Sequence, residues 1–263
     1  MTIDAEVFPL PEPPPPPPAP PEFGAGKAIL TFVAAMGAQF LAGIGAMIIA
    51  VMYTLAVNGP KALERPNAID LLTKQFMPLM LLLAMLATGF AVFICARIFM
   101  WGRLREIGVA PAPLGATLGW AVAGVAMAAA YLLFAARLVP PDPNAPAGPM
   151  AQLAEEGGLA RIALAIAAVL LAPPVEEFLF RGMLFRGFSK SWGNVTAAIV
   201  TTVLFVLLHL ADVWHYWPAI VMIALMALLT LTARLKTGSL VPSWAAHAAY
   251  NATVMVGVYV VAP

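Results

Sequence analysis

The sequence has few charged residues for its length, and this scarcity excludes most classes of soluble protein. Only 10% of its 263 residues are Asp, Glu, Lys or Arg, whereas 62% are hydrophobic and the mean hydropathy is +0.90. A typical soluble domain carries about 25% charged residues. The 14 Lys and Arg are scattered between apolar segments, so they form no basic surface for nucleic acid. The composition therefore predicts an integral membrane protein whose surroundings are the lipid bilayer, without a nucleic-acid partner.

Cysteine is almost absent, and basic residues are missing from the start of the chain. The single cysteine, Cys95, excludes an intrachain disulfide, and without a catalytic motif around it we interpret it as a small core hydrophobe. The first 26 residues contain no Lys or Arg, which excludes a signal peptide. Ten prolines lie between Pro9 and Pro21. This composition predicts that residues 1–26 form a disordered, extended polyproline tail in the cytoplasm.

Long apolar segments follow the tail, and most are near the roughly 20 residues that a helix needs to cross a bilayer. The predicted fold is all-α, a transmembrane helical bundle of about seven spans, within a range of six to eight. We divide it into N-terminal helices at 27–150 and a C-terminal core at 151–263. The proline-rich segment Val139–Pro149 should form an exposed loop before the core. The expected spans are 28–57, 76–96, 116–136, 160–187, 194–211, 217–233 and 239–262.

The basic residues between the spans predict the orientation of the bundle. If the N-terminus is cytoplasmic, most of them fall on the cytoplasmic side, as the positive-inside rule requires. The basic residues of the opposite side are accompanied by acidic ones. Together with the enrichment in Ala, Leu and Pro, this pattern predicts a prokaryotic plasma (inner) membrane protein with its N-terminus inside. The expected cytoplasmic group is Arg97, Arg103, Arg105, Arg186, Lys190, Arg234 and Lys236.

Three charges inside the fourth span are the first functional signal. The segment Pro173–Arg181 reads PPVEEFLFR, and each such charge costs about 2.5 to 3.5 kcal/mol at a helix centre on insertion scales. The two prolines should kink or break the helix and place Glu176 and Glu177 in the first turn of a new one, where the helix dipole favours carboxylates. Arg181 follows Glu177 by four residues, the spacing of an ion pair on one helix face. Glu177 is therefore predicted to pair with Arg181, which leaves Glu176 for chemistry.

Two of the three histidines lie inside apolar helices rather than in loops. His209 follows Phe205 by four residues, and His247 precedes Asn251 by four, so each pair projects from one helix face. Polar groups at such depth need internal partners. Phe205 is predicted to pack in the core, with a substrate-orienting role as the alternative, and Asp212 is predicted to be solvated near the next loop.

The order of these motifs resembles that of a known family. Glu-Glu-x-x-x-Arg, Phe-x-x-x-His and His-x-x-x-Asn, the last preceded by Thr-Gly-Ser-Leu, occur in that order between Leu171 and Asn251. This pattern is similar to the CAAX protease and bacteriocin-processing family of intramembrane endopeptidases. The resemblance implies a helical bundle that hydrolyses peptide bonds at a site within the membrane, reached from the cytoplasmic side. The first 150 residues carry no motif of the family.

The resemblance also implies a role for each residue. Glu176 matches the family's water-activating glutamate, His209 the histidine that helps hold this water, and His247 with Asn251 the pair proposed to stabilise the oxyanion. Peptide hydrolysis needs a base for water and donors aimed at the developing oxyanion, so the residue types suit the reaction. The expected partner is a membrane-associated protein or peptide substrate; the sequence leaves the oligomeric state open.

Alternatives to this interpretation concern the metal and the function class. We favour a mechanism without a cofactor; the alternative is zinc bound by Glu176, His209 and His247, because two imidazoles and a carboxylate are a common zinc set. No His-Glu-x-x-His motif supports it. A catalytically silent scaffold or bacteriocin-immunity protein on the same bundle is the alternative function. A proton-coupled transporter is weaker, since it predicts paired broken helices and only one break is visible.

Overall fold

The computed structural model describes residues 22–155 and 158–261, and within them the chain is helical without any strand. This confirms the all-α prediction. Among the residues that the structure describes, six helices are long and apolar enough to span a membrane, and α11 lies where the seventh span is predicted. Five of these six spans contain α1 (Ala25–Asn58), α2 (Ala68–Phe99), α3 (Leu114–Ala130), α9 (Asn194–Val213) and α10 (Trp217–Thr237). The sixth is Gly158–Trp192. Helix α11 comprises Val241–Val261.

Residues 1–21 of the predicted polyproline tail lie outside the described residues. The last residues of the predicted tail pack against the bundle: Phe23 is buried, and its ring centroid lies 6.3 Å from that of Phe99. The backbone N–H of Ala25, the first residue of α1, donates to Ser191 Oγ at 2.8 Å. Helix α1 therefore begins slightly earlier than predicted.

The fourth span is one helix built from segments of alternating hydrogen-bond register. Its parts are α6 (Gly158–Ala165), the π-helix η4 (Ile166–Leu171), α7 (Ala172–Glu177), the π-helix η5 (Phe178–Leu184) and α8 (Phe185–Trp192). The prediction was a kink or a break at the prolines; of these, the break followed by a new helix is wrong. The two prolines lie at the start of α7, directly after the π-helix η4, and their missing N–H groups leave carbonyls of the preceding turn without a helical donor.

The position of the two glutamates changes accordingly. Glu176 and Glu177 are the last residues of α7, and its first turn holds no acidic residue. Because the helix continues through η5 into α8, no free helix N-terminus faces the carboxylates. The predicted stabilisation by a helix dipole is therefore wrong, and Glu177 has side-chain partners, Arg181 and His247, instead.

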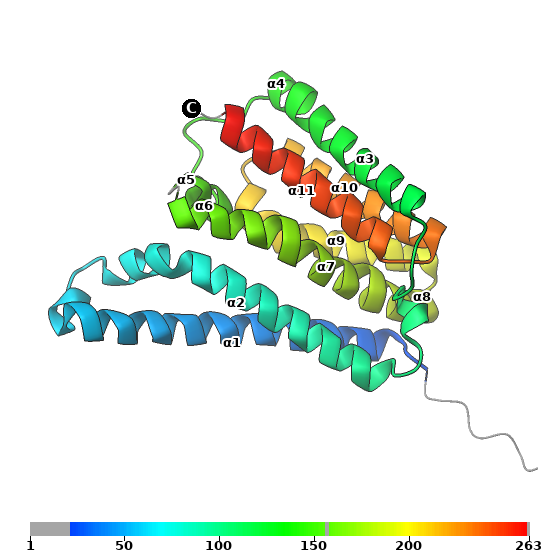
Figure 1. Ribbon diagram of the computed structural model, residues 1–263, viewed down its shortest axis with the longest axis horizontal. Helices are drawn as coiled ribbons and strands as arrows, with labels where there is room; N and C mark the ends of the chain where they lie inside the picture. The colour runs from blue at the N-terminus through cyan, green and yellow to red at the C-terminus, as the bar shows by residue number, and fades with distance from the viewer. Residues whose placement is uncertain (1–21, 156–157, 262–263) are drawn as a thin grey trace, which may run out of the picture.

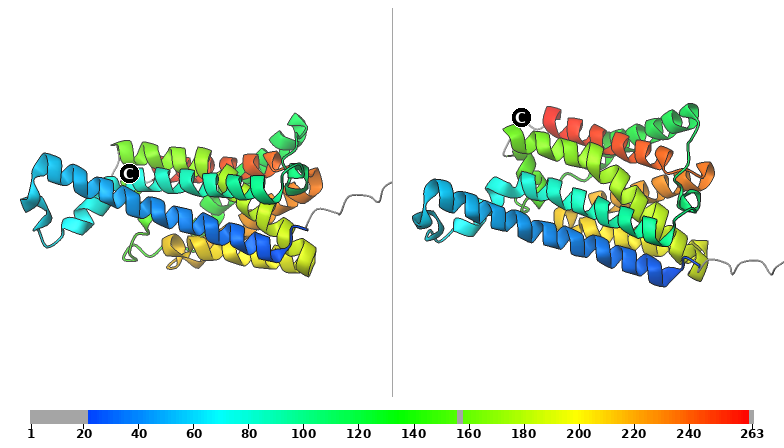
Figure 2. Two further views of the ribbon diagram at one scale, coloured as in Figure 1. Left: turned by 90° about the horizontal axis from the view of Figure 1, so that it is seen from below. Right: turned by 60° about the horizontal axis from the view of Figure 1, so that its bottom comes forward.

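The helices run side by side along the long axis of the molecule (Figures 1 and 2). Helix α1 pairs with α2 on one flank, α3 pairs with α11 on the other, and the fourth span lies between the two pairs (Figure 1). Small residues allow the α3–α11 contact, since a side chain at Gly124 would collide with the backbone of Ala246. This close packing holds the α11 segment around His247 inside the bundle.

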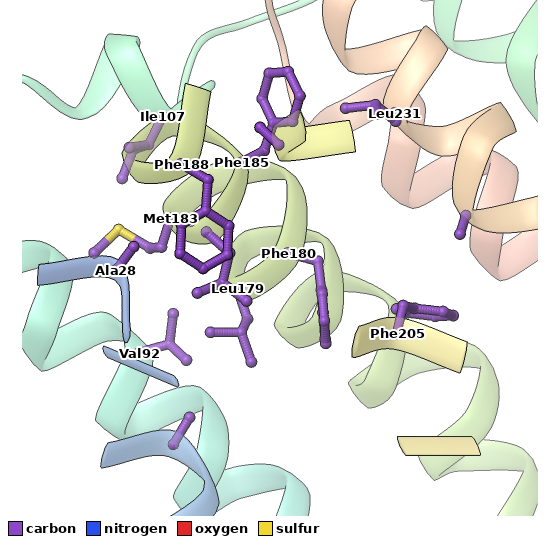
Figure 3. Close-up of a cluster of buried hydrophobic side chains, with 14 of the residues drawn as sticks. Ala28, Val92, Ile107, Leu179, Phe180, Met183, Phe185, Phe188, Phe205 and Leu231 are labelled. Atoms are coloured by element: carbon purple, nitrogen blue, oxygen red, sulfur yellow. The ribbon is translucent and has the colours of Figure 1, made fainter. Parts of the chain in front are cut away.

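An apolar core joins the fourth span to α1, α2 and α9. Leu179, Phe180, Met183 and Leu184, all from η5, are almost fully buried. Phe180 lies edge-on against Phe205 of α9, with ring centroids 5.1 Å apart (Figure 3). Such pairs add about 0.5–1.5 kcal/mol to burial alone. The core therefore fixes α7 and its glutamates relative to α9.

One end of the bundle, here called the basic end, contains α8, the 3-10 helix η2 (Leu104–Ile107) and the α10–α11 turn. Glu106 accepts hydrogen bonds from Arg103 at 2.6 Å and from Arg186 at 2.5 Å. These two guanidinium groups, Arg103 first, lower the pKa of Glu106 to about 2. Arg234 donates to the Glu106 carbonyl at 3.0 Å, so one short helix is tied to α8 and α10.

The opposite end, here called the α5 end, contains α5 (Pro149–Glu155), the α9–α10 turn and the end of α11. Helix α3 continues into the short helix α4 (Ala136–Leu138). Between α4 and α5 the chain is not helical and most of it is exposed, as predicted for the proline-rich loop. The hydroxyl of Tyr216 donates to the Val139 carbonyl at 2.6 Å and ties this loop to the α9–α10 turn.

Candidate functional site

A hollow of about 620 Å³ lies inside the bundle, and the four residues predicted to be catalytic all line it. Glu176 comes from α7, His209 from α9, and His247 with Asn251 from α11. The three helices thus bring these polar side chains, distant in sequence, to one internal surface whose other walls are mostly apolar. Their chemical roles remain predictions.

His247 is held between the two glutamates. Its Nδ1 lies 2.9 Å from Glu177 Oε1, and its Nε2 lies 3.8 Å from Glu176 Oε2. Since a carboxylate only accepts, Nδ1 carries the hydrogen, and Nε2 is the ring nitrogen that faces Glu176. Glu177 therefore orients the imidazole, a role that the spacing of the glutamates in the sequence did not reveal.

Glu177 also forms the predicted ion pair, with Oε2 3.3 Å from Arg181 Nε. Both side chains are buried, and Arg181 additionally donates to the Ala227 carbonyl of α10 at 3.0 Å. Its guanidinium carbon lies 4.6 Å from the Phe205 ring centroid, a cation–π distance. The pair therefore joins the fourth span to α10 and, through His247, to α11.

Glu176 is placed differently from its neighbour. Its Oε2 is buried, and no hydrogen bond to it is formed by the part of the chain that the structure describes. The side chain is 18% exposed, so it reaches the hollow while Glu177 stays enclosed. This difference follows from the angle of about 100° between consecutive helical residues.

The tautomer of His209 follows from its backbone contact. Nδ1 lies 2.8 Å from the carbonyl oxygen of Phe205, one turn earlier on α9. A carbonyl cannot donate, so Nδ1 carries the hydrogen and Nε2 keeps a lone pair for another donor such as water. The Phe205 ring stacks on the imidazole at 4.5 Å and contacts His247 edge-on at 5.9 Å. Phe205 is thus buried core, as predicted, and it positions both imidazoles.

Asn251 has a structural partner that explains how the prolines are tolerated. Its Nδ2 donates to the carbonyl of Ala168 in η4 at 2.7 Å. In the π register this carbonyl would accept from residue 173, and Pro173 has no N–H to donate. The amide of α11 therefore satisfies a carbonyl that the proline releases. The second hydrogen of the same amide group is not needed for this bond.

The hollow extends from these groups toward the α5 end, where Met150, Ala151 and Ala154 line it. A smaller recess of about 460 Å³ lies on the basic-end side and reaches Glu177 between Pro174 and Trp244. The larger cavity thus includes residues of the α5 end, whereas the smaller recess lies at the basic end.

Other lining residues carry no motif in the sequence. Gln39 and Thr88 come from α1 and α2, Tyr131 from the π-helix η3 (Tyr131–Ala135), and Tyr250 from α11. Asp212, predicted to be solvated near the α9–α10 turn, is partly exposed beside that turn and also lines the hollow. Of these residues, only Tyr250 could have been found from the sequence, because it directly precedes Asn251. The others are recognisable only from helix packing.

The zinc alternative can be compared with the donor geometry. Within residues 22–155 and 158–261, no group of three or more His, Cys, Asp or Glu side chains is arranged to hold a metal ion. Glu176 Oε2 lies 3.8 Å from His247 Nε2, and His209 lines the same cavity, so the metal-independent mechanism stays a prediction.

The fold and the site together define an integral membrane protein with carboxylate, imidazole and amide groups around an internal cavity. Residues 158–253 match the family model described as Type II CAAX prenyl endopeptidase Rce1-like. This match confirms the resemblance to the CAAX protease and bacteriocin-processing family that the motifs indicated, and it covers all seven site residues. No curated protein and no solved structure matches the chain.

Proposed function

We propose that the protein is an intramembrane endopeptidase that hydrolyses a peptide bond in a membrane-associated protein or peptide. The observation that carries the proposal is the placement of Glu176, His209, His247 and Asn251 around one hollow, with Glu176 Oε2 buried and free of hydrogen bonds from the described residues. The family match supports endopeptidase activity in general. The proposed membrane is a prokaryotic inner membrane with the N-terminus in the cytoplasm.

In the proposed mechanism, a water molecule attacks the scissile carbonyl carbon. His209 Nε2 accepts a hydrogen bond from this water and orients it, and Glu176 takes its proton as the new C–O bond forms. Negative charge develops on the carbonyl oxygen, where the second amide hydrogen of Asn251 and a protonated His247 Nε2 donate. The C–N bond then breaks, and Glu176 returns the proton to the leaving amine.

The residues behind the site keep these groups in position. Glu177 holds His247 through Nδ1, so a proton on Nε2 can point into the hollow. Arg181 compensates the charge of Glu177, and Phe205 packs against both imidazoles. We therefore assign Glu177 and Arg181 to positioning, and Phe205 to packing and orientation.

Replacing Glu176 by Gln tests the proposal, because the amide has nearly the same shape and cannot act as the base. We expect turnover to fall by at least about 10²-fold, with an unchanged melting temperature in detergent. Comparing the membrane peptides of cells that produce the wild type or Glu176→Gln would also identify the substrate. Glu155→Gln, an exposed glutamate of α5, is the matched control.

Wild-type cleavage by Glu176→Gln would remove the assignment of the base. A complete absence of Glu176-dependent peptides, with a folded protein present, would instead support the silent scaffold. The same assay after exhaustive chelation addresses the metal: retained activity would exclude a zinc mechanism, and stoichiometric bound zinc with lost activity would overturn the metal-independent proposal.

A further inference from the structure

Asp212 lines the hollow on the side of the α5 end. It is partly exposed in the last turn of α9, three residues after His209. Three residues advance about 4.5 Å along a helix, and residues three apart lie on adjoining parts of the helix surface. The carboxylate of Asp212 therefore lies about one turn from the proposed catalytic imidazole, on the side of the α5 end.

One oxygen of this carboxylate already has a structural partner. Asp212 Oδ1 accepts a hydrogen bond from the backbone N–H of Met150 at 2.9 Å. The chain fits tightly here, since a side chain at Gly148 would collide with the Asp212 backbone. A neutral acceptor such as an asparagine oxygen can also form the contact with Met150. The negative charge of Asp212 thus exceeds what docking of α5 requires.

Among the Asp, Glu, Lys and Arg side chains of the described residues, those that line the hollow are all acidic. Glu176 and Asp212 line it, and among the described residues neither Lys nor Arg contributes to its walls. Arg181 lies behind Glu177 rather than at the surface of the cavity. Apolar walls of low dielectric strengthen the field of such charges. A cationic group inside the hollow near Asp212 is therefore favoured, and an anionic one is disfavoured.

We propose that Asp212 is a specificity residue that binds a basic side chain of the substrate close to the scissile bond. The inference rests on the proposed endopeptidase function and deepens it by defining the substrate class. An extended peptide advances about 3.3 Å per residue, so a Lys or Arg one to three residues from the scissile bond reaches Asp212 while His209 faces the bond. The substrate is thus a polypeptide with a basic residue flanking its cleavage site.

The test uses dye-labelled peptides with an apolar stretch and a variable flank. One flank position at a time carries Lys, the uncharged norleucine or Glu. Binding to the full-length Glu176→Gln protein is measured by fluorescence anisotropy, and cleavage by the protein with Glu176 intact is measured separately. We expect about fivefold tighter binding of the best Lys peptide than of its norleucine counterpart, the value of a partly exposed ion pair of about 1 kcal/mol.

Substitutions at Asp212 separate the charge from the docking of α5. Asp212→Asn keeps the acceptor for Met150 and should abolish the preference for Lys without changing the melting temperature. Asp212→Lys should transfer the preference to the Glu peptide. Asp142→Asn is the matched control, because Asp142 lies in the exposed loop before α5 and bonds within that loop to Asn144.

The outcomes distinguish this inference from the proposed function. Equal binding of Lys and norleucine peptides, or a Lys preference that survives Asp212→Asn, would overturn the role of Asp212 even if cleavage occurs. A preference that depends on Asp212 in the binding assay would support that role even if no peptide is cleaved, and the hydrolase proposal alone would fail.

Discussion

Removing the carboxylate of Glu177 while keeping Arg181 is the most demanding perturbation that the site offers. Both side chains are at most 3% exposed, and their charges are 3.3 Å apart. Glu177→Ala leaves the guanidinium buried without its anion and also removes the acceptor of His247 Nδ1. Breaking a buried pair in this way costs about 3–5 kcal/mol, a large part of the roughly 5–15 kcal/mol that stabilises a typical protein.

The structure predicts that removing both charges of the pair costs less than removing the anion alone. Arg181→Met removes the uncompensated charge and fills a similar volume against Phe205, so Glu177→Gln combined with Arg181→Met should be more stable than the sum of the single changes predicts. We expect a coupling energy of about 2–3 kcal/mol. Glutamine still offers His247 an acceptor, so the double variant keeps the contact between α7 and α11.

The assay is a double-mutant cycle from reversible unfolding in detergent, followed by tryptophan fluorescence. Matched pairs in which a lipid-facing residue such as Phe40, 70% exposed, is changed to Leu control for general loss of packing. Additive single effects would refute the conclusion that the buried pair is one electrostatic unit. Destabilisation below about 1 kcal/mol for Glu177→Ala would show that the arginine finds another anion.

Two other perturbations test separate parts of the structure. Glu106→Gln should lower the free energy of unfolding by less than about 1 kcal/mol at pH 7, because the ion pairs of Glu106 are partly exposed. The pKa of Glu106 in the folded state, about 2, lies below the ordinary 4.5. The difference in stability between wild type and variant is therefore complete above pH 4.5 and vanishes as the pH falls through 2. Melting curves of both proteins from pH 7 to pH 2 check this, and a difference that grows with acidity would contradict it. Asn251→Ala should lower turnover by roughly 10²–10³-fold through loss of an oxyanion donor, and stability by about 1–3 kcal/mol because the Ala168 carbonyl becomes unpaired. Adding Pro173→Ala supplies an N–H for this carbonyl and should restore the melting temperature but not turnover; restoration of both would assign Asn251 to a purely structural role.

The lengths and apolarity of the helices could be predicted from the sequence because the bilayer imposes them locally. A helix must satisfy its own backbone within about 20 residues of hydrocarbon, so composition alone indicates each span. The motif residues could be predicted for a related reason. Glu176, His209, His247 and Asn251 are polar groups in apolar helices, and such groups need partners inside the bundle.

The course of the chain through Pro173 and Pro174 could not be predicted from those residues alone. A proline deprives an earlier carbonyl of its donor, and locally this favours a break. The carbonyl of Ala168 instead finds Asn251, which is 83 residues away in sequence. The helix therefore continues, and the glutamates lie at the end of α7 rather than at a helix start.

By itself the sequence determined that the chain spans a membrane as helices, that Glu177 and Arg181 pair within one helix, and which polar residues need each other, because periodicity and apolarity act over one or two turns. Only the tertiary structure decided that Glu177 also holds His247, that Phe205 packs against both imidazoles, and that Asp212 lines the hollow. These contacts join different helices, and their existence depends on how the helices rotate and pack against one another, which the spacing within any one helix does not contain.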